Sequence, residues 1–257
     1  MNMLWYKSWL ETRWRFVIGL ALLMLSACGV VLVYPQVVKL LPLTSRPDLS
    51  GEVGRRVTEA MELARTYRGY VWTQWFHQNM PQTWGLFAVL LGTGGLLSQS
   101  ARGGATFTLS LPVTRNRLVG VRAATGLAEL LTLALVPSLL LPLLSPLIGQ
   151  SYGFGDALIY ALCMFIGGAV FFSLAFLLST VFNDVWRPLL ITICVALVLT
   201  TIETIFRGLS RYGLLRVMCA EVYFRGDGLP WLGLLASAAL SAVMLYAAAL
   251  NIARQDF

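Results

Sequence analysis

Charged residues are scarce in this sequence. Of its 257 residues, 12% are charged and 58% are hydrophobic, whereas soluble domains carry about 25% charged residues. The 19 basic and 12 acidic side chains are too few to cover the surface of a soluble globule of this length. This composition excludes an ordinary soluble enzyme and predicts that lipid surrounds most of the chain.

Lysine, histidine and paired cysteines are also nearly missing. Lys7 and Lys39 are the only lysines and neither follows a glycine, so the phosphate-binding loop GxxxxGK[ST] is excluded. His77 is the single histidine, and the four cysteines form no CxxC pair, which argues against a Cys/His metal site. We therefore expect a chain that is not itself an enzyme and binds no metal or cofactor. The net charge of +7 lies in short clusters between apolar runs, which is typical of membrane proteins and not of nucleic-acid-binding proteins.

Six apolar runs are candidates for crossing a bilayer, which takes roughly 20 helical residues. The third contains Pro137, Pro142 and Pro146, so we expect that helix to bend or end within its second half. The sequence predicts an all-α integral membrane protein with a single transmembrane domain over residues 1–257. The expected spans are 16–38, 82–99, 118–148, 157–182, 188–206 and 230–253.

The segments between the spans are patterned too. Residues 1–15 carry an apolar stripe and predict an interfacial (elbow) helix that lies flat before the first span. In the external loop 39–81, helical spacing over 53–67 predicts an amphipathic helix. The aromatic stretch 70–76 suits the lipid headgroup layer. The second external loop, 207–229, predicts a shorter amphipathic helix.

Six spans place both termini on one side of the membrane. Basic residues are nearly balanced, with nine on the terminal side and ten on the other. The stretch Arg102–Arg122 is short, contains no acidic residue and adjoins the spans, and such loops weigh most in setting orientation. We therefore expect both termini in the cytoplasm.

The segment 100–117, between the second and third spans, has the features of a cytoplasmic docking element. Gly103 and Gly104 end the second span, Pro112 stops a short apolar element, and Thr114 can cap the next helix. Exposed apolar residues on a chain without a nucleotide site favour docking of a partner protein. The apolar residues are Phe107, Leu109 and Leu111.

This segment resembles the signature of the ABC type-2 exporter permeases. The matching residues are Arg102-Gly103, Phe107, Leu109-Ser110-Leu111-Pro112-Val113-Thr114-Arg115 and Arg117. The N-terminal WLETRWRF, Trp9 to Phe16, is similar to that family's entry into its first span. The sequence departs from the family pattern at Gln99, Gly104 and Thr106, where the family often has Glu, Thr and Glu.

The resemblance implies one membrane half of an ATP-driven exporter in the bacterial inner membrane. Such a subunit dimerises with itself or a relative and works with two separate ATPase subunits, which carry the ATP and Mg. The implied ATPase-coupling residues in the coupling helix are Arg102, Gly103, Phe107, Leu109, Leu111, Pro112, Thr114, Arg115 and Arg117. The apolar composition of the spans favours an amphiphilic or hydrophobic substrate.

Two carboxylates, Glu129 and Glu203, fall inside predicted spans, where ionisable residues are costly. Glu129 lies seven residues after Arg122 on the same helical face, which favours a structural pair. Glu203 lies four residues before Arg207, which favours an i,i+4 pair. The alternatives are a polar lining of the translocation path or a proton relay. The relay defines the rival function, a proton-coupled secondary transporter that uses Glu129 and Glu203.

Overall fold

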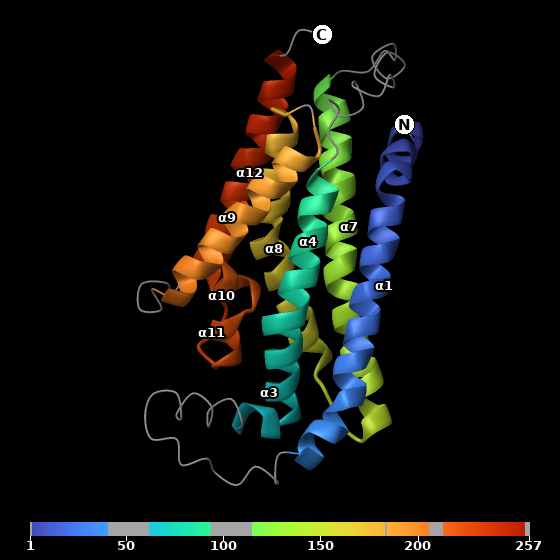
Figure 1. Ribbon diagram of the computed structural model, residues 1–257, viewed down its shortest axis with the longest axis vertical. Coiled ribbons are helices and arrows are strands. Elements are labelled where there is room, and N and C mark those ends of the chain that lie inside the picture. Colours follow the sequence, from blue (N-terminus) through green and yellow to red (C-terminus); the bar gives the residue numbers. More distant parts are fainter. Residues whose placement is uncertain (1, 41–61, 94–114, 183, 206–212, 255–257) are drawn as a thin grey trace.

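A computed structural model describes residues 2–40, 62–93, 115–182, 184–205 and 213–254. This part of the chain is helical and contains no strand. The longer elements form a bundle with the two termini at the same end (Figure 1). In chain order the elements are α1 (Asn2–Leu40), α3 (Tyr67–Val71), the π-helix η2 (Trp72–Asn79), α4 (Met80–Gly92), α7 (Arg115–Leu144), the 3₁₀-helix η3 (Ser145–Ile148), α8 (Phe154–Ser179), α9 (Trp186–Ile205), α10 (Leu214–Met218), α11 (Glu221–Phe224) and α12 (Trp231–Arg254).

Five helices are long and apolar enough to cross a membrane. They correspond to the first, third, fourth, fifth and sixth predicted spans. Their apolar segments are Leu4–Lys39, Arg117–Ile148, Phe154–Ser179, Trp186–Glu203 and Trp231–Arg254. The protein is therefore a multi-span helical membrane protein.

The helix at the second predicted span, 82–99, does not begin where the sequence predicted. Within the described residues it is represented by α4, whose 13 residues continue directly from η2 and α3 without a break. The aromatic stretch 70–76, expected in the headgroup layer, is packed inside the protein instead, with Trp75 and Phe76 fully buried. Residues 53–61 of the predicted external helix lie outside the described residues.

The N-terminal helix also differs from the prediction. It is not a separate flat helix, because α1 runs continuously from Asn2 to Leu40. No glycine or proline interrupts residues 2–18, and polar residues of these first turns are tied to α4 and α7. The aromatic side chains of this part point away from the bundle, with Trp5, Tyr6, Trp9 and Trp14 between 42% and 67% exposed.

The three prolines of the third predicted span were expected to bend its helix or to end it within its second half. The helix passes through Pro137 and Pro142, ends at Leu144 and continues as the 3₁₀-turn η3, which contains Pro146. Gly149 then adopts a left-handed backbone conformation with φ of 69°. A proline removes one helical hydrogen bond, and in α7 the neighbouring helices hold the chain in place.

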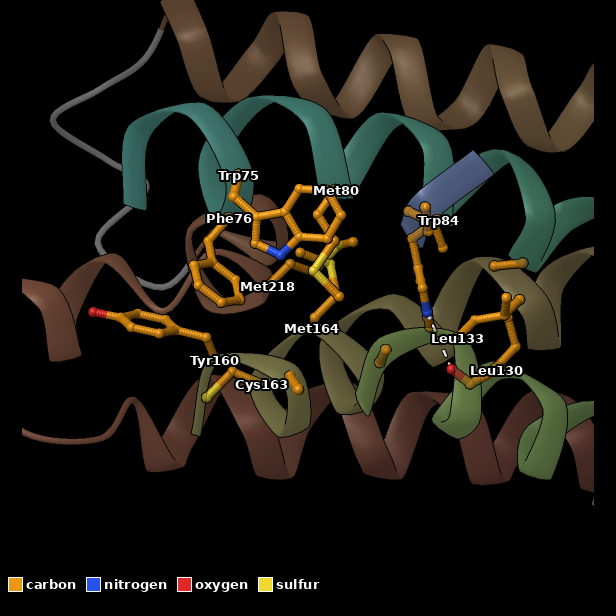
Figure 2. Packing of buried hydrophobic residues seen from close by; sticks show 14 of the residues in the cluster. Trp75, Phe76, Met80, Trp84, Leu130, Leu133, Tyr160, Cys163, Met164 and Met218 are labelled. Atoms are coloured by element: carbon orange, nitrogen blue, oxygen red, sulfur yellow. Dashed lines mark hydrogen bonds between the residues drawn. The ribbon is translucent and has the colours of Figure 1, made fainter. Parts of the chain in front are cut away.

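Helix α8 is the most buried span and forms the centre of the bundle, in contact with α4, α7, α9, α10 and α12. Gly168 of α8 lies under the ring of Trp84, and Gly167 lies under Met218 of α10. Figure 2 shows Trp75, Phe76 and Met80 on the side of α8 that carries Tyr160 and Met164. The core therefore contains large side chains on both sides, and the glycines of α8 let Trp84 and Met218 approach that helix closely, as packing in lipid favours.

Candidate functional site at the terminal end of the bundle

The first turns of α1 present a polar face to the bundle. Glu11, Thr12 and Arg15 lie within one turn of each other and contact two helices, α4 and α7. In Figure 1 the start of α1, the end of α4 and the start of α7 lie toward the same end of the molecule. Thr93 and Arg115, the described residues on either side of 94–114, belong to these helix ends. This end is therefore where the predicted coupling segment is attached.

Arg15 binds the carboxyl end of α4. Its Nη1 donates hydrogen bonds to the backbone carbonyls of Leu90, at 2.7 Å, and Thr93, at 2.9 Å. The last carbonyls of a helix have no partner within the helix and form the negative end of its dipole. The guanidinium thus supplies both hydrogen bonds and an opposite charge, an arrangement that contributes about 0.3–2 kcal/mol when it is partly buried.

Glu11 and Thr12 connect α1 to α7. The hydroxyl of Thr12 donates to Oε1 of Glu129 at 2.5 Å, and both side chains are buried. Nη1 of Arg122 donates to Oε2 of Glu11 at 3.3 Å. The second carboxylate oxygen of Glu129 is buried without a hydrogen bond.

The predicted pairing of Glu129 with Arg122 is thus modified by tertiary contacts. Arg122 forms an ion pair with Glu11 of another helix. Sequence spacing identified two residues on one face of α7, and the residues that complete the cluster come from α1. The motif Trp9–Phe16 contains these α1 residues, and their spacing, which places Glu11, Thr12 and Arg15 on one helical face, is a signal that could have found them.

The remaining predicted coupling residues are partly described. Arg115 and Arg117 stand in the first turn of α7, and Arg117 is exposed. The others lie outside the described residues: Arg102, Gly103, Phe107, Leu109, Leu111, Pro112 and Thr114.

Glu203 is placed far along the chain from this cluster, at the end of α9. Its Oε1 accepts a hydrogen bond from the backbone N–H of Leu215, at 3.2 Å, in the first turn of α10. A Cβ on Gly213 would lie 2.6 Å from the Glu203 carboxyl carbon, so a larger residue there would require the Glu203 side chain to shift. Arg207, its predicted partner, lies outside the described residues. The structure does not bring Glu129 and Glu203 together, because one carboxylate binds α1 and the other binds α10.

A second polar cluster joins three segments toward the other end of the bundle. Asp156, in the first turn of α8, accepts a hydrogen bond from the Tyr223 hydroxyl at 2.8 Å and forms an ion pair with Nε of Arg68 at 3.3 Å. The hydrogen bond to Asp156, followed by burial, raises the pKa of Tyr223. Burial raises the pKa of Tyr152, whose hydroxyl has no hydrogen-bond partner. Arg68, Asp156 and Tyr223 therefore tie α3, α8 and α11 together.

The described residues contain no group of three or more His, Cys, Asp or Glu side chains able to hold a metal ion. The four cysteines, Cys28, Cys163, Cys194 and Cys219, are free thiols, and two of them, Cys163 and Cys219, are buried. Burial raises the pKa of Cys219 to about 12, so this thiol stays protonated at neutral pH. It is a poor nucleophile and a poor metal ligand in that state.

Comparison with protein-family models, curated proteins and solved structures finds no match for this chain.

Proposed function

We propose that this chain is the membrane-spanning permease subunit of an ATP-driven ABC exporter that moves an amphiphilic or hydrophobic substrate outward. The observation that carries the proposal is the match of residues 102–117 to the ABC type-2 permease signature, on a chain that lacks a phosphate-binding loop. The described residues on either side support it. Thr93 lies before this segment, Arg115 and Arg117 at its end begin α7, and α1 holds the end of α4 and the first half of α7 at the same end of the bundle.

In this proposal two ATPase subunits dock on the segment 100–117 of two permease chains, from the cytoplasmic side. ATP and Mg belong to those partners. Closure of the ATPases moves the segment, and the flanking helices α4 and α7 pass this motion to α8, which both of them contact. The path for the substrate forms between the two permease chains, which are either two copies or two relatives.

The proton-coupled rival receives no support from the placement of its two carboxylates. A relay needs titratable groups that exchange protons through short contacts, and Glu129 and Glu203 have their hydrogen-bond partners on different elements. We therefore propose only the ATP-driven exporter.

The test is to purify the protein from its native membrane in mild detergent and to identify the proteins that accompany it. We expect an ATPase subunit with a phosphate-binding loop to co-purify. Leu109→Arg should abolish this association or uncouple ATP hydrolysis from export, because it places a charge in the proposed docking surface. Phe107→Ala should act in the same direction.

The matched control is Asp227→Arg, an exposed position in the turn that follows α11. This variant should keep the ATPase. Association and transport that are unchanged in Leu109→Arg would contradict the proposal. So would transport that needs no ATPase and stops when the proton gradient is dissipated.

A further inference from the structure

The carboxyl end of α4 is held by a side chain of another helix. Thr93, the C-cap residue, has an extended backbone with φ of −80° and ψ of 147°, so the chain leaves the helix axis at this residue. Thr93 is fully buried, and its hydroxyl donates to the carbonyl of Leu90 at 3.0 Å. The same carbonyl accepts from Arg15. The point where the chain departs towards residues 94–114 is therefore fixed by side chains and not left to solvent.

A close approach one turn further along α1 positions Arg15 for this role. A Cβ on Gly19 would lie 2.8 Å from the ring of Phe87 in α4, so glycine at this position lets the two helices meet. Arg15 and Gly19 are four residues apart and share a helix face. The face that contacts α4 thus combines a steric contact at Gly19 with a polar contact at Arg15.

The neighbouring positions of α1 hold the other flank of the same segment. Glu11 and Thr12 bind Arg122 and Glu129 of α7, the helix that begins where residues 94–114 end. One stretch of α1, residues 11–15, therefore contacts both helices that flank this segment in the sequence.

We propose that Arg15 is a positioning residue for the segment 94–114: by holding the carbonyls of Leu90 and Thr93, it sets the direction in which the chain leaves α4 and makes α1 part of the moving unit. Because the inference gives Arg15 a role in coupling, it rests on the proposed function. The contact of Arg15 with α4 can be tested without a partner, so the two can fail separately.

The experiment compares Arg15→Gln, Arg15→Lys and the control Arg13→Gln in the purified full-length chain. Arg13 lies two residues away on the same helix, is exposed, and has its guanidinium over the ring of Trp14 at 5.7 Å. Both glutamine variants remove one trypsin site and one positive charge. The readout is the rate of tryptic cleavage after Arg102, followed for that bond by mass spectrometry, together with the thermal midpoint of the chain.

We expect Arg15→Gln to raise the cleavage rate after Arg102 by about fivefold, because loss of the cap increases the population of open conformations in proportion to the lost stabilisation. Arg13→Gln should leave the rate unchanged. Arg15→Lys should restore at least half of the difference, since an ammonium also donates to carbonyls. The thermal midpoint of Arg15→Gln should fall by no more than about 2–4 °C, the shift that a loss of about 1 kcal/mol causes in a chain of this size, which separates a local effect from unfolding.

Equal cleavage rates in Arg15→Gln and Arg13→Gln would overturn the positioning role, as would a failure of Arg15→Lys to restore the rate. A second arm uses the ATPase that co-purifies. There, Arg15→Gln should lower the ratio of substrate-stimulated to basal hydrolysis while the partner still binds, and an unchanged ratio would overturn the coupling role. If no ATPase co-purifies, the proposed function fails, and the cleavage rates still decide whether Arg15 holds the end of α4.

Discussion

Individual glycines decide how closely the helices of this protein approach one another. A Cβ on Gly168 would lie 2.1 Å from Cζ3 of Trp84, and one on Gly92 would lie 2.7 Å from the carbonyl oxygen of Phe172. Trp84 cannot yield easily, because it is fully buried and its Nε1 donates to the carbonyl of Leu130 at 3.1 Å. The dashed line in Figure 2 marks this hydrogen bond. Gly168 is thus required by the neighbouring tryptophan.

Gly168→Ala should destabilise the protein by about 1–3 kcal/mol, the usual cost of adding a methyl group to a packed core. The matched control is Gly155→Ala on the same helix, where an added Cβ meets nothing within 4 Å. This control should be neutral or stabilising by up to about 1 kcal/mol, because alanine favours the helix over glycine. Thermal unfolding in detergent, followed by circular dichroism, measures both. Equal midpoints for the two variants would show that Trp84 can move aside.

Residue patterns predicted which side chains matter in α7 but not their partners. Glu129 was identified as an ionisable residue within an apolar run, and its partner Thr12 lies 117 positions earlier in the chain. A hydroxyl is too common for any local pattern to single it out. Arg15 was noticed as part of a motif, but its contact with backbone carbonyls depends on how α1 and α4 cross.

At the scale of elements, the short helices α10 and α11 are anchored to the α3–η2 segment by several contacts. Trp72 of η2 donates from Nε1 to the carbonyl of Cys219 at 3.1 Å, and its ring stacks on Phe224 at 4.2 Å. Tyr223 adds the hydrogen bond to Asp156. The π-helix η2 is part of this anchor: π-turns are rare and frequently mark functional segments. The segment 214–224 is thus attached through side chains of η2 and α8.

Asp156→Asn should loosen this attachment. It removes the charge that pairs with Arg68 and weakens the acceptor for Tyr223, and hydrogen bonds to charged groups contribute about 1.5–3 kcal/mol. We expect faster amide hydrogen exchange over 214–228 and a lower thermal midpoint. Exchange rates that do not change would mean that the contacts of Trp72 alone hold α10 and α11.

The control for this prediction is Asp184→Asn. Asp184 pairs with Arg187 at the surface and caps the start of α9 through the backbone N–H of Arg187. Asparagine is an equally good N-cap, and exposed ion pairs contribute about 0–1 kcal/mol. Asp184→Asn should therefore leave both the midpoint and the exchange over 214–228 nearly unchanged.

At the scale of the whole molecule, the bundle places distant parts of the chain at two opposite ends. Both termini and the junction between α8 and α9 lie at one end, and α11 lies toward the other (Figure 1). The orientation proposed from the basic residues adds that the terminal end faces the cytoplasm. Residues at the α8–α9 junction are therefore expected on the cytoplasmic side of the membrane, and residues near α11 on the outer side.

Single cysteines at Asp184 and Asp227, both exposed, test this arrangement in a background without the four native cysteines. A membrane-impermeant maleimide should label Asp227→Cys in intact cells and Asp184→Cys only after the membrane is opened. Reaction of both residues from the same side would contradict the arrangement of the bundle. The reverse pattern would leave the bundle intact and invert its orientation.

The apolar runs determined by themselves that the chain is helical and crosses a membrane several times, because a span requires about 20 apolar residues whatever its neighbours are. Four of the predicted spans overlap helices whose ends differ by three residues or fewer, and the first differs at its start, where the apolar helix begins at Leu4 and not at residue 16. The aromatic stretch 70–76 was misplaced, since tryptophan and tyrosine suit both the headgroup layer and a protein core. Only the tertiary structure decided that these residues are buried. It also decided that the first turns of α1 continue the same helix and contact α4 and α7, and that Arg15 binds the end of α4. Each of these depends on which helices lie side by side, and contacts between residues far apart in the chain leave no periodic signal in the sequence.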